Sequence, residues 1–383
     1  MSGYGAAHSL YIHIPFCARK CVYCDFYSIP YDESLAHSYV TSLIGELELV
    51  KEDAGELKTV YLGGGTPTTV STLALIRLLR KIRELFVIAS NAEISIEANP
   101  GTITRESVEA LVGAGISRMS IGLQSFDDNE LKALGRIYDV QEALKAVAVA
   151  RIGGITNLGI DLMYGLPGQT LERWSEHVSK AIEIYPEHIS AYELTLEKGT
   201  PLWKAANKGD VRKPDEDAIV SMYDLTVDRL TEAGYRHYEI SNFARQGFDC
   251  RHNLNYWNRG DYLGVGAGAH SFISRRRRKN VSDVEKYISM LKRTTLPVED
   301  ETVISPEDAL RELIFLGLRK TEGIGIETAK SQFGVDLQAL STPLVVDGFL
   351  DIEHDRIRLT RKGITVSNSI ISSILASIEG ENA

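Results

Sequence analysis

Short apolar runs alternate with longer segments of helical periodicity through the first half of the chain. The runs typical of strands are Leu10–Ile14, Thr59–Leu62, Glu93–Ala98, Arg118–Leu123, Leu158–Tyr164 and His188–Leu194. In the intervening segment 72–86, apolar residues recur three or four positions apart and share one helical face: Leu73, Ile76, Leu79, Ile82 and Phe86. This alternation predicts an α/β fold with crossover units and a parallel sheet. Because six strands are fewer than the eight of a closed barrel, we expect a partial (β/α)6 barrel, with an open doubly wound sheet as the alternative.

Composition places the chain among ordinary globular proteins. It has 383 residues, of which 44% are hydrophobic and 25% charged, and this length suggests about two to three domains. No apolar run approaches the ~20 residues of a membrane helix, and the first ten residues lack the pattern of a signal peptide. Four cysteines in such a chain are typical of a reducing compartment, so we expect a cytoplasmic location. The net charge of −10 argues against a broad nucleic-acid footprint.

Polar and glycine-rich features follow the predicted strands one after another. They are a cysteine-rich loop after the first strand, Gly63–Pro67 (GGGTP) after the second, Glu97 to Pro100 at the third, Gln124 at the fourth and Asp161 in the fifth. In a parallel barrel, active sites assemble at the carboxyl ends of the strands. This series therefore predicts a site at that end.

Three of the four cysteines, Cys17, Cys21 and Cys24, fall within eight residues. A disulfide framework uses an even number of cysteines, and a structural zinc site needs four ligands, such as these three with Cys250 or a histidine. Cubane iron–sulfur clusters are held by cysteine thiolates, normally four. With three thiolates, one iron keeps an open position that can chelate an amine and a carboxylate. The cluster is the favoured interpretation, and zinc is the alternative.

The spacing C-x3-C-x2-C directly after a strand resembles the signature of the radical S-adenosylmethionine superfamily, and GGGTP resembles its glycine-rich segment. The resemblance implies a 4Fe–4S cluster that passes one electron to S-adenosylmethionine and so forms a 5′-deoxyadenosyl radical. It also implies a set of residues around that cofactor. Tyr11 and Tyr23 would flank cofactor and cluster; Gly64, Gly65 and Thr66 would border S-adenosylmethionine; Glu97 would meet its methionine end; Gln124, Arg136 and Asp161 would bind its nucleoside.

Further motifs narrow the resemblance to the HemN-like branch of this superfamily. YIHIPFC, YLGGGTPT, EANP, IGLQSF, GRIY, DLMYGLPGQT and RHNLNYWNRGDYLGVGAGAHS occur in this order over residues 8–275. The branch includes an oxygen-independent coproporphyrinogen III oxidase and a haem chaperone. The oxidase has a further cysteine where this chain has Phe26, and it has an amino-terminal extension before the cysteine strand. Both departures favour the chaperone; a radical enzyme oxidising coproporphyrinogen III or another substrate is the alternative.

The segment HNLNYW (His252–Trp257) resembles the haem motif H-N-x-x-Y-W of the chaperones. The resemblance implies haem binding through His252, Asn253, Tyr256 and Trp257, because an imidazole can ligate haem iron and an indole offers a flat apolar face. The expected partners are therefore haem and a haem-accepting protein, which respiratory proteins would include. We expect His252 to lie where haem iron can reach it, apart from the cysteine loop. If the resemblance fails here, the segment is structural.

Two features remain. Arg275–Lys279 (RRRRK) is expected to be a solvated loop. The alternative partners of this run are haem propionates or anionic lipid at a membrane surface, and nucleic acid is the least favoured.

After residue 300, two helices, a hairpin around EHDR and a last helix from Ile364 to Ile378 predict a small winged-helix-like α+β domain. The predicted domains are 1–240 (radical S-adenosylmethionine partial barrel), 241–300 (extension with HNLNYW) and 301–383 (HemN-type domain). Whether the protein is a homodimer is left open.

Overall fold

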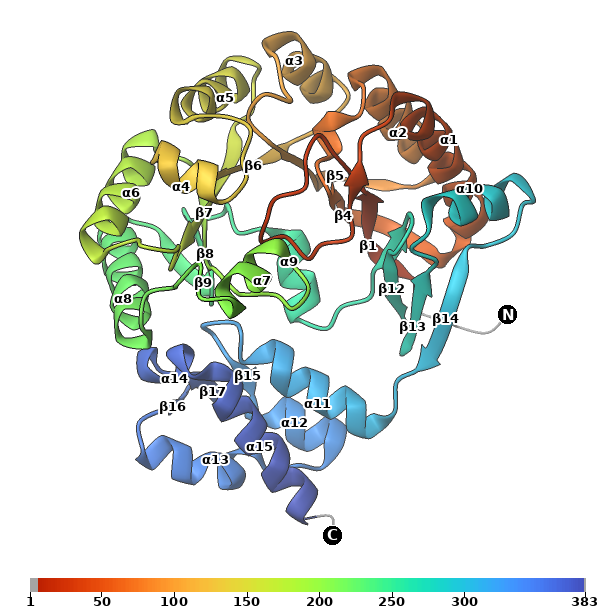
Figure 1. Ribbon diagram of the computed structural model, residues 1–383. Coiled ribbons are helices and arrows are strands. Elements are labelled where there is room, and N and C mark those ends of the chain that lie inside the picture. Colours follow the sequence, from red (N-terminus) through yellow and green to blue (C-terminus); the bar gives the residue numbers. More distant parts are fainter. Residues whose placement is uncertain (1–5, 382–383) are drawn as a thin grey trace.

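The computed structural model describes residues 6–381 and shows an open partial barrel (Figure 1). Six parallel strands form its wall: β1 (Ala7–Ile14), β4 (Ala54–Gly64), β5 (Ile88–Ala98), β6 (Arg118–Gln124), β7 (Asn157–Tyr164) and β8 (His188–Glu193). Helices cover its outside: α1 (Glu33–Val50), α2 (Thr72–Leu85), α3 (Arg105–Gly113), α5 (Val140–Ile152), α6 (Leu171–Ile184) and α8 (Glu216–Glu232). The predicted (β/α)6 barrel is confirmed.

Three further strands extend the sheet. Among the described residues its order is β11-β1-β4-β5-β6-β7-β8-β10-β9, so the edge strands β11 (Leu263–Val265) and β9 (Arg236–Glu239) do not pair and the barrel stays open. β11 runs parallel to β1, and β10 (Asn242–Ala244) runs antiparallel to β8. A two-stranded pair, β2 (Phe16–Cys17) with β3 (Ile29–Pro30), closes the base of the cysteine loop.

Helix α2 corrects one detail of the sequence pattern. Leu73, predicted to belong to its buried face, is 80% exposed. The core side of the helix is instead formed by Leu75, Leu78, Leu79 and Ile82. Leu73 lies in the first turn, whereas Leu79, Ile82 and Phe86 of the predicted stripe are buried as expected, so the correction is confined to the start of the helix.

The segment after the barrel contains a small sheet of β12 (His270–Ile273), β13 (Arg276–Asn280) and β14 (Val298–Val303), with the short helices α9 (Arg251–Trp257) and α10 (Val284–Lys292). Two other short helices belong to the barrel: α4 (Asp128–Ala133) follows β6, and α7 (Pro201–Asn207) follows β8. Glu46 of α1, only 2% exposed, accepts hydrogen bonds from the Asn280 amide (2.6 Å) and the Gly266 backbone (2.8 Å). This buried carboxylate anchors the segment to the barrel.

The carboxyl-terminal part contains the predicted two helices, hairpin and last helix, and the structure adds a strand, β15, and a helix, α13, that the sequence pattern did not predict. It contains α11 (Pro306–Gly317), β15 (Ile324–Gly325), α12 (Ile326–Phe333), α13 (Leu337–Val346), β16 (Leu350–Glu353), β17 (Arg356–Leu359), α14 (Arg361–Thr365) and α15 (Ser367–Glu381). The hairpin turns at His354 and Asp355, both with positive φ, as predicted around EHDR. The last helix begins at Ser367 and not at Ile364, because the short helix α14 precedes it.

This part has its own apolar core and is joined to the rest by charged contacts. Arg361 pairs with Asp224 and Asp228 of α8, and Glu312 of α11 pairs with Arg259 and Arg277. The domain boundaries at 240/241 and 300/301 stay predictions. Within residues 6–381, none of the helices combines the length and apolar character needed to cross a bilayer.

Candidate functional site

The cysteine loop lies over the carboxyl end of the parallel strands, as predicted (Figure 1). Its base is held by backbone hydrogen bonds from Ile29 to Pro15 and from Tyr31 to Cys17. The neighbouring GGGTP segment is bonded to the same strand, because the backbone N–H of Gly65 donates to Ile14 O at 2.9 Å. The cysteine loop and the GGGTP segment are therefore held next to each other by backbone hydrogen bonds.

Glycine is required at two positions of this segment. Gly64 has φ of +120°, a conformation that side-chain-bearing residues rarely adopt. At Gly65, a Cβ atom would lie 2.7 Å from Phe16 O and 3.0 Å from Cys17 Sγ. The glycines thus allow the backbone to approach the cysteine loop more closely than any other residue would.

The three thiols of the loop are electrostatic neighbours. Burial raises the pKa of Cys17 and of Cys24, and charge on the neighbouring cysteines of the loop raises both further. Cys250 lies elsewhere: it is buried beside Glu93, and burial raises its pKa to about 12. Hence Cys250 is not available as a fourth ligand for the loop.

The loop thiols bear on the choice between a cluster and a single metal ion. Within residues 6–381, no three His, Cys, Asp or Glu side chains converge closely enough to hold one metal ion. That finding gives no support to the mononuclear zinc alternative. A cubane cluster binds each thiolate through a different iron, so three thiols spread along one loop suit it.

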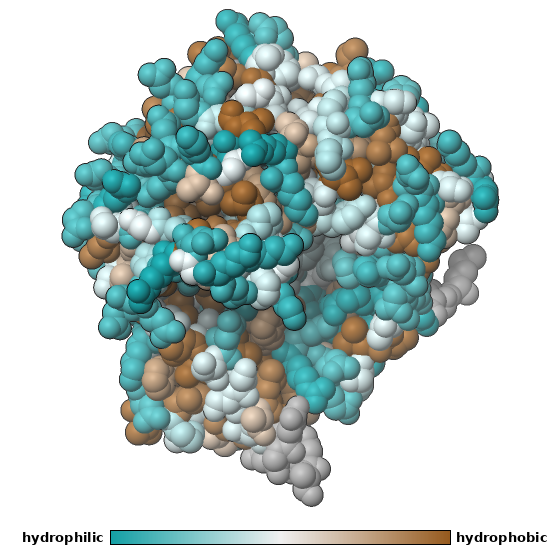
Figure 2. Space-filling model, in the orientation of Figure 1, coloured by the Kyte–Doolittle hydropathy of each residue, from teal (hydrophilic) through white to brown (hydrophobic). Residues whose placement is uncertain are grey.

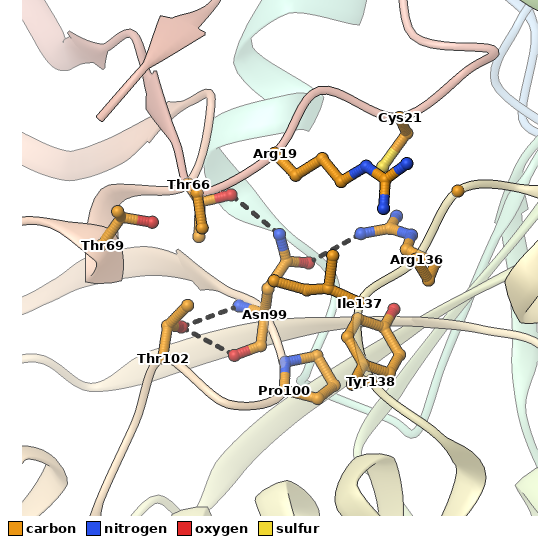
Figure 3. A pocket seen from close by; sticks show the side chains of 12 residues that line it. Arg19, Cys21, Thr66, Thr69, Asn99, Pro100, Thr102, Arg136, Ile137 and Tyr138 are labelled. Carbon is orange, nitrogen blue, oxygen red and sulfur yellow. Dashed lines mark hydrogen bonds between the residues drawn. The ribbon is translucent and has the colours of Figure 1, made fainter. Parts of the chain in front are cut away.

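A chain of polar side chains encloses the loop from below (Figure 3). Arg136 donates to Asn99 Oδ1 (3.0 Å) and to the Tyr23 hydroxyl (2.6 Å), and the Asn99 amide donates to Thr66 Oγ1 (2.7 Å). Thr66 Oγ1 in turn lies 3.8 Å from Cys17 Sγ. A small pocket, partly open to solvent, lies beside these residues. Asn99 therefore links Arg136 to Thr66. The sequence pattern placed Asn99 at the end of the third strand but did not assign it a role.

Glu97 occupies the interior of the barrel beside the glycine segment. It accepts hydrogen bonds from the Tyr61 hydroxyl (2.7 Å) and from the Gly64 backbone (3.1 Å). Burial, with a contribution from Asp161, raises the pKa of Glu97 to about 7. Asp161 accepts from Ser120 at 3.1 Å, and burial raises its pKa as well. Two half-buried carboxyl groups whose hydrogen-bond donors in the described part of the chain are neutral suit a cationic ligand.

Two other predicted residues have buried polar atoms without a partner among the described residues. They are Gln124 Oε1, on a residue with φ of +69°, and Arg136 Nε. Buried polar groups are normally hydrogen-bonded, so such atoms mark places for a ligand. Tyr11 is different, because its hydroxyl is hydrogen-bonded to His13 Nδ1 at 2.9 Å.

The segment HNLNYW forms α9, and here the structure departs from expectation. His252 is 1% exposed, with Nδ1 hydrogen-bonded to Thr59 Oγ1 (2.7 Å) and Nε2 to the Tyr256 hydroxyl (2.9 Å). Burial lowers its pKa to about 3. It lies apart from the cysteine loop, as expected, but in this conformation haem iron cannot reach it, because both ring nitrogens are engaged inside the barrel.

The other residues of this segment are partly buried. The ring of Trp257 faces Arg319, whose guanidinium carbon lies 5.9 Å from its centroid, and Asn258 accepts a hydrogen bond from Lys320. Asn253 is half-buried. The carboxyl-terminal domain therefore covers the end of α9.

Arg275–Lys279 is not the expected solvated loop. Arg276–Asn280 is β13, the middle strand of the sheet β12-β13-β14. Its cations pair with acidic side chains: Arg276 and Arg278 with Glu301, Arg278 also with Asp53, Arg277 with Glu312, and Lys279 with Glu299. Composition alone could not distinguish this run from a solvated loop, because the acidic residues that pair with its cations lie on other helices and strands.

The comparisons with known proteins agree with this geometry. Residues 11–181 match the family model of the radical SAM superfamily, and residues 304–366 match the HemN C-terminal domain. The fold resembles that of HemN, the coproporphyrinogen III oxidase of Escherichia coli, with a TM-score of 0.83 and 24% identity over 97% of this chain and 90% of that one. The protein thus has the radical SAM fold with a HemN-type carboxyl-terminal domain.

Closer relatives identify the branch. The haem chaperone HemW of Bacillus subtilis is 33% identical over 97% of this chain and 100% of its own length. HemW of Lactococcus lactis is 35% identical over 96% of this chain and 97% of its own. HemW of Haemophilus influenzae reaches 43% over 70% of both chains. The chain belongs to the HemW family, which confirms the resemblance to the haem-chaperone branch.

Proposed function

We propose that this protein is a cytoplasmic haem chaperone that holds a 4Fe–4S cluster and S-adenosylmethionine, binds haem, and transfers it to an acceptor protein. One observation carries the proposal: a chain of the HemW family brings three loop cysteines, a close-packed glycine segment and two half-buried carboxyl groups to one end of its barrel.

The proposed ligands follow from the positions above. Cys17, Cys21 and Cys24 hold the cluster, which when bound supplies one electron and an open iron for an amine and a carboxylate. The protein groups around S-adenosylmethionine are those predicted: Tyr11, Tyr23, Gly64, Gly65, Thr66, Glu97, Gln124, Arg136 and Asp161. Glu97 accepts the ammonium, and Gly64 and Gly65 leave room for it.

Haem contact through His252, Asn253, Tyr256 and Trp257 stays part of the proposal, with one condition. Because His252 is enclosed by Thr59 and Tyr256, the end of α9 must open before this imidazole can bind iron.

A nucleic-acid role is disfavoured for the winged-helix-like domain. Helix α13 has no Lys or Arg that could contact phosphates, and the hairpin turn carries the acidic residues Glu353 and Asp355.

A combined assay tests the proposed function against porphyrinogen oxidation. The full chain is reconstituted anaerobically, titrated with haem, and supplied with coproporphyrinogen III and S-adenosylmethionine in the same preparation. We expect a saturable shift of the haem Soret band and no protoporphyrinogen. Turnover to protoporphyrinogen would make the chain an oxidase, and an unshifted Soret band would remove haem binding from the proposal.

Glu97→Gln and Asp161→Asn are each expected to weaken S-adenosylmethionine binding by ~10- to 100-fold, the equivalent of about 1.5–3 kcal/mol for a hydrogen bond to a charged group. Calorimetry on the cluster-loaded protein measures this. Because the Glu97 carboxyl has a pKa of about 7 and binds a cation only when ionised, wild-type affinity should rise as pH increases through 7. Glu97→Gln should lose that pH dependence.

The exposed Glu106→Ala is the matched control and should bind as the wild type does. Unchanged affinity in both Glu97→Gln and Asp161→Asn, with the cluster present, would assign these carboxyl groups a structural role only.

A further inference from the structure

Two motifs of the sequence contain buried polar residues that the proposed function does not use. Ser125 follows Gln124 in IGLQSF, and Gln169 belongs to DLMYGLPGQT. Their exposed fractions are 0% and 4%, so each needs a hydrogen-bond partner inside the protein. The two side chains share one partner, the carboxylate of Glu130 on α4, which is itself 6% exposed.

Glu130 joins three segments of the barrel through one oxygen atom. Its Oε2 accepts hydrogen bonds from the Ser125 hydroxyl (2.5 Å) and the Gln169 amide (3.2 Å), and it is hydrogen-bonded to His177 Nε2 (2.8 Å). Ser125 lies after β6, Gln169 lies in the loop after β7, and His177 lies on α6. The Ser125 oxygen also accepts from the backbone N–H of Asp127 at 3.0 Å. The carboxylate therefore fixes the turn after β6 to the next crossover unit.

The backbone of that turn is unusual at Gln124. This residue has φ of +69°, and the N–H of Ser125 donates to the carbonyl of Leu123, two residues back, at 2.9 Å. A hydrogen bond of this span around a residue of positive φ forms a γ-turn of the rare, strained type. Gly122 and Gln124 also pair with consecutive residues of β7, so β6 has one extra residue here, a β-bulge. The strand end is thus shaped by two local distortions.

Contacts on both sides hold the distorted strand end. The Tyr138 hydroxyl donates to the carbonyl of Gly122 at 2.5 Å, before the turn. Ser125, after the turn, is held by Glu130. A residue with a side chain keeps a positive φ only where the surrounding structure fixes it, and strained backbone of this kind gathers at ligand sites.

The turn directs the carboxamide of Gln124 toward the predicted cofactor residues. A Cβ on Gly122 would lie 2.9 Å from Gln124 Nε2, 2.9 Å from Asn99 Oδ1 and 3.8 Å from Arg136 Nη2. The three polar side chains therefore converge over Gly122, where the missing side chain leaves room for them. Gln124 Oε1 is buried without a partner among the described residues, which leaves an acceptor for a ligand.

The Glu130 network itself lies in the wall of the barrel. In Figure 1, α4 and α6 lie next to each other at the rim, and Figure 2, in the same orientation, shows that the centre of this face is hollowed. Because Ser125, Glu130, Gln169 and His177 are all buried, they can affect a ligand only through the turn at Gln124.

We propose that Glu130 is a positioning residue for S-adenosylmethionine. Its carboxylate holds Ser125 and so keeps Gln124 in the turn of positive φ, with Oε1 directed at a hydroxyl or amino group of the nucleoside. The inference rests on the proposed function, in which Gln124 binds the nucleoside. It adds to that function a residue that acts through Gln124 alone.

Glu46 provides a matched control within the same chain. Its carboxylate is 2% exposed and also accepts three hydrogen bonds, from the Tyr287 hydroxyl, the Asn280 amide and the Gly266 backbone. Glu46 lies on the outer helix α1, and its donors belong to the segment after the barrel. Glu46→Gln should therefore reduce stability to urea and leave the affinity for S-adenosylmethionine unchanged.

The test is a calorimetric titration of full-length, cluster-loaded proteins with S-adenosylmethionine. We expect Glu130→Gln and Ser125→Ala each to bind about tenfold more weakly than the wild type, equivalent to ~1.4 kcal/mol, with unchanged iron content. Ser125→Ala removes only the hydroxyl between the turn and the carboxylate, so it tests the same link with little change in packing. An equal loss of affinity in Glu46→Gln would assign the effect to general instability and overturn the inference.

A double-mutant cycle shows whether Glu130 acts through Gln124. In a Gln124→Ala background, Glu130→Gln should cause no further loss of affinity, because the side chain that it positions is absent. A second tenfold loss in that background would overturn the inference, as would wild-type affinity in both Glu130→Gln and Ser125→Ala; the proposed function would stand in either case. If the wild type does not bind S-adenosylmethionine, the proposed function fails and this inference fails with it.

Discussion

Replacing any one of Cys17, Cys21 or Cys24 with serine is expected to abolish the 4Fe–4S cluster, whereas Cys250→Ser is expected to leave it intact. Each loop thiolate fixes one corner of the cluster, and serine is a poor ligand for this iron. Cys250 is buried beside Glu93, away from the loop. Iron and acid-labile sulfide content, together with the visible absorption of the anaerobically reconstituted protein, measure the effect.

Two controls make this result specific. The loop variants should keep the melting temperature of the apo wild type, because the three thiols are half-buried and the loop base is held by backbone hydrogen bonds. Cys250→Ser should be checked beside Cys250→Ala, since a fully buried serine hydroxyl has its own cost. Loss of the cluster in Cys250→Ser together with its retention in Cys24→Ser would overturn the ligand assignment.

Glu93→Ala is expected to destabilise the barrel by about 3 kcal/mol or more. Glu93 of β5 is 6% exposed and accepts hydrogen bonds from the backbone N–H groups of Arg251 (3.1 Å) and His252 (3.3 Å) at the start of α9. Without the carboxylate, one buried and one partly buried backbone donor lose their acceptor. The helix that carries the predicted haem segment loses its anchor at the same time.

Urea denaturation measures the loss, with the exposed Glu106→Ala as a control expected within about 0.5 kcal/mol of the wild type. Hydrogen exchange gives a local readout, because amides of residues 250–257 should exchange faster in Glu93→Ala while β6 and β7 keep their protection. Wild-type stability with unchanged exchange in α9 would show that Glu93 does not hold this helix.

The cofactor end of the barrel and α9 are linked by one stack of rings. Tyr61 donates to Glu97 and its ring stacks on His252, with 5.1 Å between centroids. Tyr11 stacks on Tyr61 from the first strand, at 6.3 Å. Glu97 is therefore two contacts away from the imidazole of His252, which connects segments far apart in the chain.

The sequence by itself determined the barrel and the end of it at which the candidate site lies. A strand buried on both faces is usually a largely apolar run, and consecutive parallel strands are separated by helix-length crossovers, so the six strands could be located within about five residues. The carboxyl ends of such strands share one rim, which is why Cys17, Gly64, Glu97 and Asp161 could be assigned to one site from their positions along the chain.

Only the tertiary structure decided the fate of residues whose partners come from distant segments. The polar neighbours of His252 in HNLNYW suggest an exposed side chain. In the structure, Thr59 and Tyr256 enclose it because α9 packs against the barrel. The arginine run becomes a strand because Glu301 and Glu312, from other elements, neutralise it. Burial and charge pairing depend on which surfaces meet in space, and that information is not contained in local periodicity or spacing.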